Sequence, residues 1–436
     1  MNLNLDTTPA ALTGKLITPT DPRYDDFRST YTTVGHPAVV VVPESASDVA
    51  AALLMARDRG LPLAVRSGGH GLAGRGTNNE GLVIDLRRLN KVTVLDHRKR
   101  LVRVEAGARW AQVAQALSPH GLAISSGDHG NVGVGGLAVG GGVGWLVRRF
   151  GLTVDRVRAV DVVLADGSVV RADAQNEPDL LWVMRGAGAG AGVAVAFEIE
   201  AMELRSVGYA QIAARVDPAG QVLQRMDAVL RDAPRELTTA LMLSSQGADT
   251  HVFITAVVAT DDQQAIRRAI EPLLGIGDAT LQQALVTPYR SLVPRHHLHA
   301  NVGQMASSTS NGLITDMTPT AARAMVDAVS GPTPVLIQMR SLGGAVADID
   351  PSATAFPHRH QRSLVIASSF PPYGHEALGK AWEPVAEHTQ GAYVNFESNP
   401  DKAAFDRTYP GSVGTRVTEL WKRYDPEGVL RTGARS

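Results

Sequence analysis

Short apolar runs and amphipathic stretches alternate along the first two hundred residues. Residues 38–42 form a continuous apolar run, and residues 46–59 carry apolar side chains three or four positions apart. The first pattern predicts a buried strand, and the second predicts a helix with one apolar face. Ser45 and Asp48 fit a capping box at the start of this helix, and Gly60 is a typical end.

The same patterns predict the other elements of this region. Asp166 and Gly167 separate two apolar segments and form the dipeptide typical of a tight β-hairpin turn. The predicted strands are residues 61–66, 81–86, 100–105, 157–164, 168–171 and 193–204, and a further predicted helix is 110–117.

From about residue 206 the segments become longer. Strands and amphipathic helices alternate there, which predicts an α+β fold with an antiparallel sheet covered by helices. The predicted strands are residues 209–216, 237–245, 251–259, 335–340 and 362–370, and the helices are 221–231, 261–274, 321–329 and 375–388. We therefore expect a second domain at residues 206–390. The final residues 391–436 carry too little apolar surface to fold alone and should dock elsewhere.

The composition narrows the class of protein. The 436 residues hold 42 Lys and Arg against 43 Asp and Glu, for a formal net charge of −1. This balance argues against nucleic acid or an anionic membrane as a partner, since either needs a basic patch. No run approaches about 18 uncharged apolar residues, and residues 1–6 lack a secretion signal, so we expect a cytoplasmic protein. The chain has no cysteine, which excludes disulfides and any cysteinyl bond to a cofactor.

Glycine is concentrated in three clusters, at residues 66–74, 126–144 and 185–192. Without a Cβ in the way, consecutive backbone N–H groups can wrap an anion. Residues 69–74 match G-x-G-x-x-G, but a loop rather than a helix follows, so the Rossmann motif is rejected. Three clusters so close together indicate one dinucleotide held mainly by backbone amides.

Several segments of the chain together form a recognisable pattern. They are 41–49, 66–70 (RSGGH), 82–86, 132–136 (VGVGG), 140–144, 179–186, 393–396 (YVNF) and 422–426. In these segments the chain resembles the vanillyl-alcohol-oxidase / p-cresol-methylhydroxylase (PCMH) superfamily. Within it the chain resembles the berberine-bridge-enzyme-like oxidases of the 6-hydroxy-D-nicotine oxidase type. The resemblance implies a two-subdomain PCMH-type FAD-binding domain at residues 1–205, with its core at about 36–207. It also implies that residues 391–436 return to the FAD domain.

The resemblance implies roles for individual residues. His70 corresponds to the histidine that bonds covalently to the 8α-methyl carbon of FAD. His129 stands where many relatives have a second, cysteinyl link, so the flavin is predicted to be monocovalent. Val132 corresponds to a position where a small side chain admits O2 to the flavin, which favours an oxidase. The residues expected to contact FAD are Arg66, Ser67, Gly68, Gly69, His70, Gly71, Ser126, Gly127, His129, Val132, Gly133, Gly136, Gly140, Gly141, Gly142, Gly144, Val193 and Asn395.

Such an enzyme would transfer a hydride from an amine or alcohol carbon of a small organic substrate to flavin N5. O2 would then reoxidise the flavin and give H2O2. An alcohol needs a base for its O–H proton, whereas a neutral amine does not. Relatives often use the last Tyr of a Y-x-N-Y motif as this base, and Phe396 at that position slightly favours an amine. The candidate catalytic residues are His358, His360 and Tyr393, and further candidates for a base are Tyr289, His296, His297 and His299. Strand alternation would place His358 and His360 on one face, just before the apolar residues 364–366.

Two other interpretations stay open from the sequence alone. A flavoprotein-fold cyclase or isomerase would use the pocket without net redox turnover, and a binding protein would keep the flavin as a structural part. The expected partners are a small-molecule substrate and O2, a homodimer is left open, and no metal is expected. A role in secondary metabolism or catabolism fits the oxidase.

Overall fold

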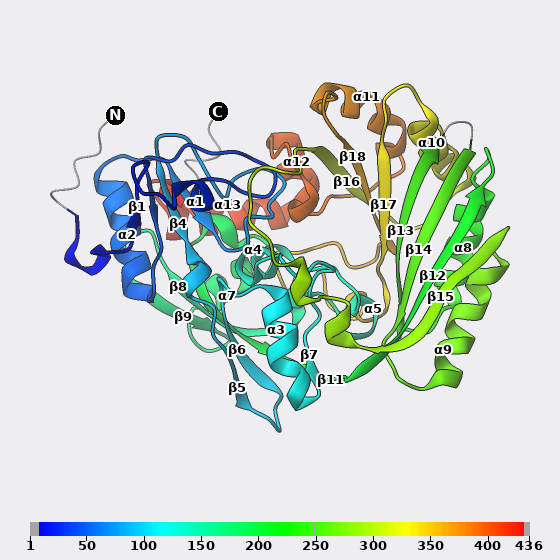
Figure 1. The fold of residues 1–436 in the computed structure, drawn as a ribbon, viewed down its shortest axis with the longest axis horizontal. Helices are drawn as coiled ribbons and strands as arrows, with labels where there is room; N and C mark the ends of the chain where they lie inside the picture. The colour runs from blue at the N-terminus through cyan, green and yellow to red at the C-terminus, as the bar shows by residue number, and fades with distance from the viewer. Residues whose placement is uncertain (1–7, 247–248, 431–436) are drawn as a thin grey trace.

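The computed structural model describes residues 8–246 and 249–430 of the chain. Residues 1–6, examined above for a secretion signal, lie outside this range, as do the last six residues of the predicted C-terminal segment. Figure 1 shows two blocks side by side. The first is formed by the N-terminal half of the chain together with the C-terminal helices, and the second is a large sheet formed by the middle of the chain.

The first block begins with a four-stranded sheet. Its strands, in spatial order, are β1 (Leu16–Ile17), β2 (Val39–Val41), β4 (Leu82–Asp85) and β3 (Leu63–Arg66). Strands β2, β3 and β4 run parallel, and α2 (Ala46–Asp58) connects β2 to β3 as a crossover helix. The predicted capping box is present, with the Ser45 hydroxyl accepting from the Asp48 backbone N–H. Because β3 and β4 are parallel, their ends bring Arg66 and Asp85 to the same edge.

An antiparallel sheet completes the first block. Its strands, in spatial order, are β5 (Val92–Asp96), β6 (Leu101–Glu105), β10 (Val193–Glu200), β8 (Val157–Val163) and β9 (Val169–Asp173). The helices of this block are α1 (Tyr24–Arg28), α3 (Trp110–Leu117), α4 (Val134–Gly140), α5 (Val147–Phe150), α6 (Thr153–Arg156) and α7 (Pro178–Met184). The predicted strand 193–204 is interrupted after Glu200, because β11 (Met202–Glu203) leaves the sheet to pair with β7 (Leu122–Ala123).

The second block is a seven-stranded antiparallel sheet. Its strands, in spatial order, are β15 (Ala279–Pro288), β12 (Ser206–Val216), β14 (Asp249–Val258), β13 (Leu237–Gln246), β17 (Leu336–Ser341), β18 (Ser363–Ser369) and β16 (Ser308–Ile314). The helices are α8 (Gln221–Asp232), α9 (Gln263–Ile270), α10 (Pro319–Ser330) and α11 (His375–Ala386). Alternate residues of β12, such as Ala210 and Ile212, join the core that these helices cover. Helices α8 and α9 lie on the side of the sheet away from the first block (Figure 1).

Two strands of this sheet were not predicted. The edge strand β15 exposes most of its side chains and therefore lacks a buried apolar period. Strand β16 is rich in Ser, Asn and Gly, yet it is almost wholly buried between β18 and the C-terminal segment. The predicted helix 261–274 is α-helical only to Ile270, and a 3-10 turn at Glu271–Gly275 follows.

The C-terminal segment packs against the first block. It carries α12 (Lys402–Thr408) and α13 (Ser412–Tyr424). The Trp421 indole N–H donates to the Ala187 carbonyl at 2.8 Å, and Arg416 contacts Asp179 of α7 at 2.8 Å. Within the described part of the chain, no helix combines the length and apolar character that a membrane crossing needs.

Candidate functional site

Two glycine turns from separate clusters of the sequence lie in direct contact. A Cβ on Gly68 would fall 2.1 Å from the backbone nitrogen of Gly133, and a Cβ on Gly133 would lie equally close to that of Gly68. Ser67 joins the loops, since its hydroxyl donates to the Ala106 carbonyl and accepts from the Gly135 N–H, at 2.5 and 3.2 Å. Only glycine allows this approach, so these clusters bring two loops together.

A buried ion pair anchors the first turn. Arg66, the last residue of β3, contacts Asp85, the last residue of β4, at 2.7 Å, and both side chains are 1% exposed. Arg87 contacts the same carboxylate at 2.8 Å. Burial alone would raise the pKa of Asp85, but the two guanidinium groups hold it below its ordinary value. The carboxylate is therefore charged and fixes the start of the turn.

Four histidines and a tyrosine, here called the histidine cluster, meet beside these turns. His70 stacks on Tyr31 with ring centroids 4.4 Å apart, and His129 lies 5.4 Å from His70. His297 stacks on His129 at 4.3 Å, and His299 lies 5.8 Å from His70. The sequence predicted His70 and His129 for this site, whereas His297 and His299 were only general candidates for a base.

Two members of the histidine cluster, His70 and His129, are held neutral. Burial, reinforced by His129 and Arg109, lowers the pKa of His70 to about 3. Burial, reinforced by His297, lowers the pKa of His129 to about 4. The Nε2 atom of His70 is buried and has no hydrogen-bond partner among the described residues. A neutral imidazole is a nucleophile, so this arrangement suits formation of a bond to carbon.

Acid should therefore destabilise the protein through His129. An unfolded histidine has a pKa near 6.5, whereas folded His129 titrates only near 4, so below pH ~6.5 the unfolded state binds more protons and is favoured. We expect His129→Gln to recover about 1 kcal/mol of the stability that the wild type loses between pH ~6.5 and ~5, with allowance for partial exposure. Urea unfolding at both pH values measures this, and equal losses in the two proteins would contradict it.

Residues 292–304, here called the crossing segment, leave the seven-stranded sheet after β15 and reach both loops. His297 Nδ1 accepts from the Gly130 N–H at 3.0 Å. Asn301 donates its side-chain N–H to the Gly68 carbonyl at 2.9 Å. Sequence reasoning missed Asn301, because it lies in a loop where no periodic pattern or motif marks it.

The second glycine cluster packs against the C-terminal Y-x-N-F motif. The Tyr393 hydroxyl accepts from the Gly142 N–H at 2.7 Å and from the Asn395 side chain at 2.8 Å. A Cβ on Gly140 would fall 2.4 Å from Asn395 Oδ1. Burial raises the pKa of Tyr393 to about 12. Tyr393 is thus a buried anchor with an engaged hydroxyl, which disfavours it as a base near neutral pH.

The structure places the other two predicted catalytic residues on a loop beside the C-terminal segment. His358 is 6% exposed, and its Nε2 lies 3.0 Å from the Thr408 carbonyl of α12. His360 is exposed. Residues 356–362 are a loop, and β18 begins only at Ser363, so the strand alternation expected to align the two histidines does not apply. The structure does not bring either of them into the histidine cluster.

The remaining residues predicted to contact FAD lie on the same loops and on β10. Val132 is partly buried against the core of the first block, and Val193 is the first residue of β10. The Ser126 hydroxyl lies 3.3 Å from that of Tyr289. A Cβ on Gly144 would fall 1.8 Å from the Ser126 carbonyl oxygen, so these parts of the second cluster touch.

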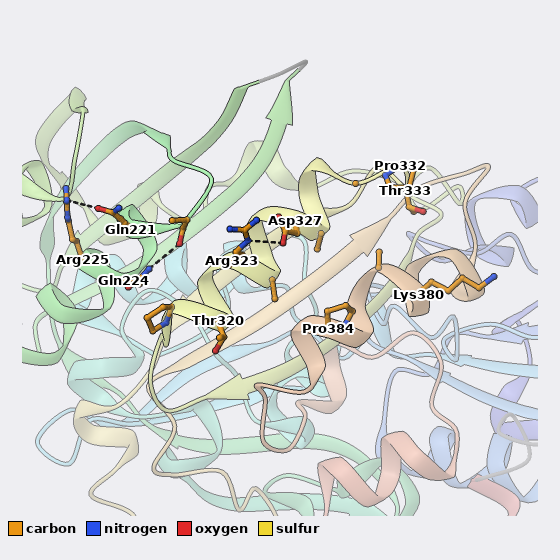
Figure 2. Close-up of a pocket in the computed structure, with 16 residues that line it drawn as sticks. Gln221, Gln224, Arg225, Thr320, Arg323, Asp327, Pro332, Thr333, Lys380 and Pro384 are labelled. Carbon is orange, nitrogen blue, oxygen red and sulfur yellow. Dashed lines mark hydrogen bonds and ion pairs between the residues drawn. The ribbon is translucent and has the colours of Figure 1, made fainter.

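The surface groove in Figure 2 lies elsewhere. It has a volume of about 1120 Å³ and runs between α8, α10 and α11, on the helical side of the seven-stranded sheet. Arg225, Arg323 and Lys380 line it, and no histidine does. Within residues 8–246 and 249–430, no group of three or more His, Asp or Glu side chains is placed to hold a metal ion.

The residues beside the histidine cluster fit a flavin dinucleotide. A Cβ on Gly71 or Gly136 would meet open space, so there is room beside these turns. His70 offers a neutral imidazole with a buried, unpaired nitrogen among the described residues. Backbone donors suit a pyrophosphate, and the imidazole suits a covalent tether.

Comparison with known proteins agrees with this geometry. Residues 37–173 match the FAD binding domain family. The chain is 26% identical to (R)-6-hydroxynicotine oxidase of Paenarthrobacter nicotinovorans, over 97% of this chain and 96% of that protein. It is 27% identical to chitooligosaccharide oxidase of Gibberella zeae, over 91% of this chain and 86% of that protein. A solved structure of a chitooligosaccharide oxidase matches with a TM-score of 0.85 at 25% identity, over 97% of both chains.

The fold and the site thus define an FAD-linked oxidoreductase with a PCMH-type fold. Along nearly its whole length the chain is similar to oxidases of the vanillyl-alcohol-oxidase / p-cresol-methylhydroxylase superfamily, and it is an FAD-dependent oxidase. The predicted α+β fold class is confirmed. The cyclase or isomerase alternative is not supported, because these relatives are named as oxidases.

Proposed function

We propose that this oxidase carries FAD on a single covalent bond to His70. The observation that carries the proposal is the neutral, buried imidazole beside two contacting glycine turns. A solved structure of glucooligosaccharide oxidase from Acremonium strictum shares the fold, with a TM-score of 0.87 at 23% identity over 96% of this chain and 97% of that chain. It is described as holding 6-S-cysteinyl, 8α-N1-histidyl FAD. Because this chain has no cysteine, only the histidyl one of these two bonds is open to it.

The bound flavin would supply the hydride acceptor. The chain's own residues would hold and orient it, with the glycine turns donating backbone N–H groups to the pyrophosphate. The Arg66–Asp85 pair would keep the turn before His70 in place. The small side chain of Val132 would leave room for O2, which we propose as the electron acceptor that yields H2O2.

An amine or alcohol carbon of a small organic molecule is the proposed site of oxidation, with an amine slightly favoured. Phe396 cannot accept a proton, and the Tyr393 hydroxyl is already engaged with Gly142 and Asn395. A neutral amine loses a hydride without an O–H proton to remove, so it needs no such base. The relatives named for 6-hydroxynicotine and for chitooligosaccharide represent the two alternatives. A cytoplasmic location, a role in secondary metabolism or catabolism, and a homodimer stay predictions.

The purified holoprotein tests this function. We expect a yellow protein whose visible flavin band bleaches when an amine substrate is added without oxygen. Admission of air should restore the band and release one H2O2 for each substrate oxidised. Substrate turnover with the flavin band unchanged would contradict the proposal, as would a colourless protein that fails to bind added FAD.

A further inference from the structure

Asn301 lies directly against the turn that presents His70. Its side-chain N–H donates to the Gly68 carbonyl at 2.9 Å, and a Cβ on Gly69 would fall 2.5 Å from the same nitrogen. Gly69 has a φ of +69°, in the left-handed region that glycine enters without strain. Because glycine permits many other conformations equally well, contacts from outside must hold this turn in one shape.

Two side chains from different blocks hold the same carbonyl. Arg109 of the first block donates to the Gly68 and Asn131 carbonyls and so ties the two loops together. Asn301 lies on the crossing segment, which connects β15 to β16 along the chain; both strands belong to the seven-stranded sheet. The turn that carries His70 is therefore held in part by a side chain from the segment that belongs to the second block.

Asn301 also has hydrogen-bonding capacity that is not used. The residue is 8% exposed, and its Oδ1 atom is buried without a partner among the described residues. Buried acceptors are nearly always paired, so this oxygen points to a donor. The Nε2 atom of His70, which lies in the turn that Asn301 contacts, is also buried and has no hydrogen-bond partner among the described residues. When Nε2 carries the imidazole hydrogen, it is a donor.

We propose that Asn301 is the positioning residue for covalent attachment of FAD to His70, and this rests on the proposed function. Its N–H fixes the peptide between Gly68 and Gly69, and its Oδ1 accepts a hydrogen bond from His70 Nε2–H during attachment. A hydrogen on Nε2 leaves the lone pair on Nδ1, so the second hydrogen bond selects the nitrogen that attacks.

The attachment step balances with dioxygen as oxidant. A C–N bond forms between His70 Nδ1 and the 8α carbon, while one C–H bond of the methyl group and the Nε2–H bond break. The two hydrogens leave as protons, and the two electrons pass to the flavin ring. Dioxygen then takes two electrons and two protons as H2O2, which restores the oxidised ring.

Full-length apoprotein, produced without riboflavin and then mixed with FAD in air, gives the attachment rate. The readout is flavin fluorescence that remains on the acid-denatured chain. We expect Asn301→Ala to attach FAD about tenfold more slowly, as for one lost hydrogen bond, with reversible FAD affinity within about twofold of wild type. Val302→Ala, a neighbour in the crossing segment whose side chain is 56% exposed, is the matched control and should attach FAD at the wild-type rate.

Asn301→Asp separates positioning from a merely structural role. It has the same size, but its carboxylate would favour the protonated form of His70. Attachment in this variant should slow as pH falls from ~8 to ~6, whereas the wild-type rate should stay flat because the pKa of His70 is near 3. A flat profile in Asn301→Asp, or a wild-type rate in Asn301→Ala, overturns the positioning role. Wild-type protein that never forms the covalent bond would instead overturn the proposed function itself.

Discussion

Replacement of His70 by alanine is expected to leave no flavin on the acid-denatured chain, whereas the wild-type chain keeps all of it. The imidazole is a neutral nucleophile beside the glycine turns, and its buried Nε2 has no hydrogen-bond partner among the described residues. The turns and the Arg66–Asp85 pair are untouched by the change, so His70→Ala should still bind FAD reversibly. After acid precipitation, the flavin absorbance of the pellet measures the covalently bound fraction, and that of the supernatant measures the released fraction.

His120→Ala is a matched control for this experiment. His120 is an exposed histidine of the first block, next to His97 and outside the histidine cluster. Its replacement should leave the covalent flavin at the wild-type level. Flavin that stays on the denatured His70→Ala chain would show that another residue carries the bond.

Asp85→Asn is expected to lower the free energy of unfolding by about 3–5 kcal/mol, the range for breaking a buried ion pair from one side. The substitution keeps the shape of the side chain but leaves Arg66 buried without its counter-ion, since both groups are only 1% exposed. Arg87, at 2.8 Å, would lose the same partner. Urea unfolding near pH 7 measures the loss.

The effect of Asp85 also has a defined pH dependence. Its pKa in the folded protein lies below the ordinary value, so its stabilising contribution is present above the unfolded pKa of about 3.9 and disappears as pH falls further. The difference between wild type and Asp85→Asn should therefore shrink only below pH ~4. Asp58→Ala, which removes an exposed contact to Arg57 at 3.0 Å, should change stability by less than about 1 kcal/mol. A loss of this small size in Asp85→Asn would contradict the buried-pair argument.

The candidate site divides into residues that the sequence marks and residues that it does not. His70 and His129 follow glycine-rich turns with a recognisable pattern, so they could be named beforehand. His297 drew attention only as part of a run of histidines, and Asn301 drew none, because their roles arise from a loop that crosses from the second block. His358 and His360 were expected on one strand face, but the residues around them form a loop.

The helices and strands likewise include some that the sequence predicts and some that it does not. Amphipathic helices such as α8 and the capped helix α2 were predictable, since their periods and caps are local in the chain. Strand β15 was not, because an exposed edge strand carries no burial pattern, and β16 was not, because its polar residues are buried by a distant segment.

By itself the sequence determined that this chain builds an α+β fold with glycine turns suited to a dinucleotide and has no cysteine for a second flavin bond. Only the tertiary structure decided which side chains surround His70, that its imidazole is neutral, and that Asn301 holds the turn before it. Turns and amphipathic periods depend on neighbouring residues. Desolvation and contacts between residues more than two hundred positions apart depend on how the whole chain packs.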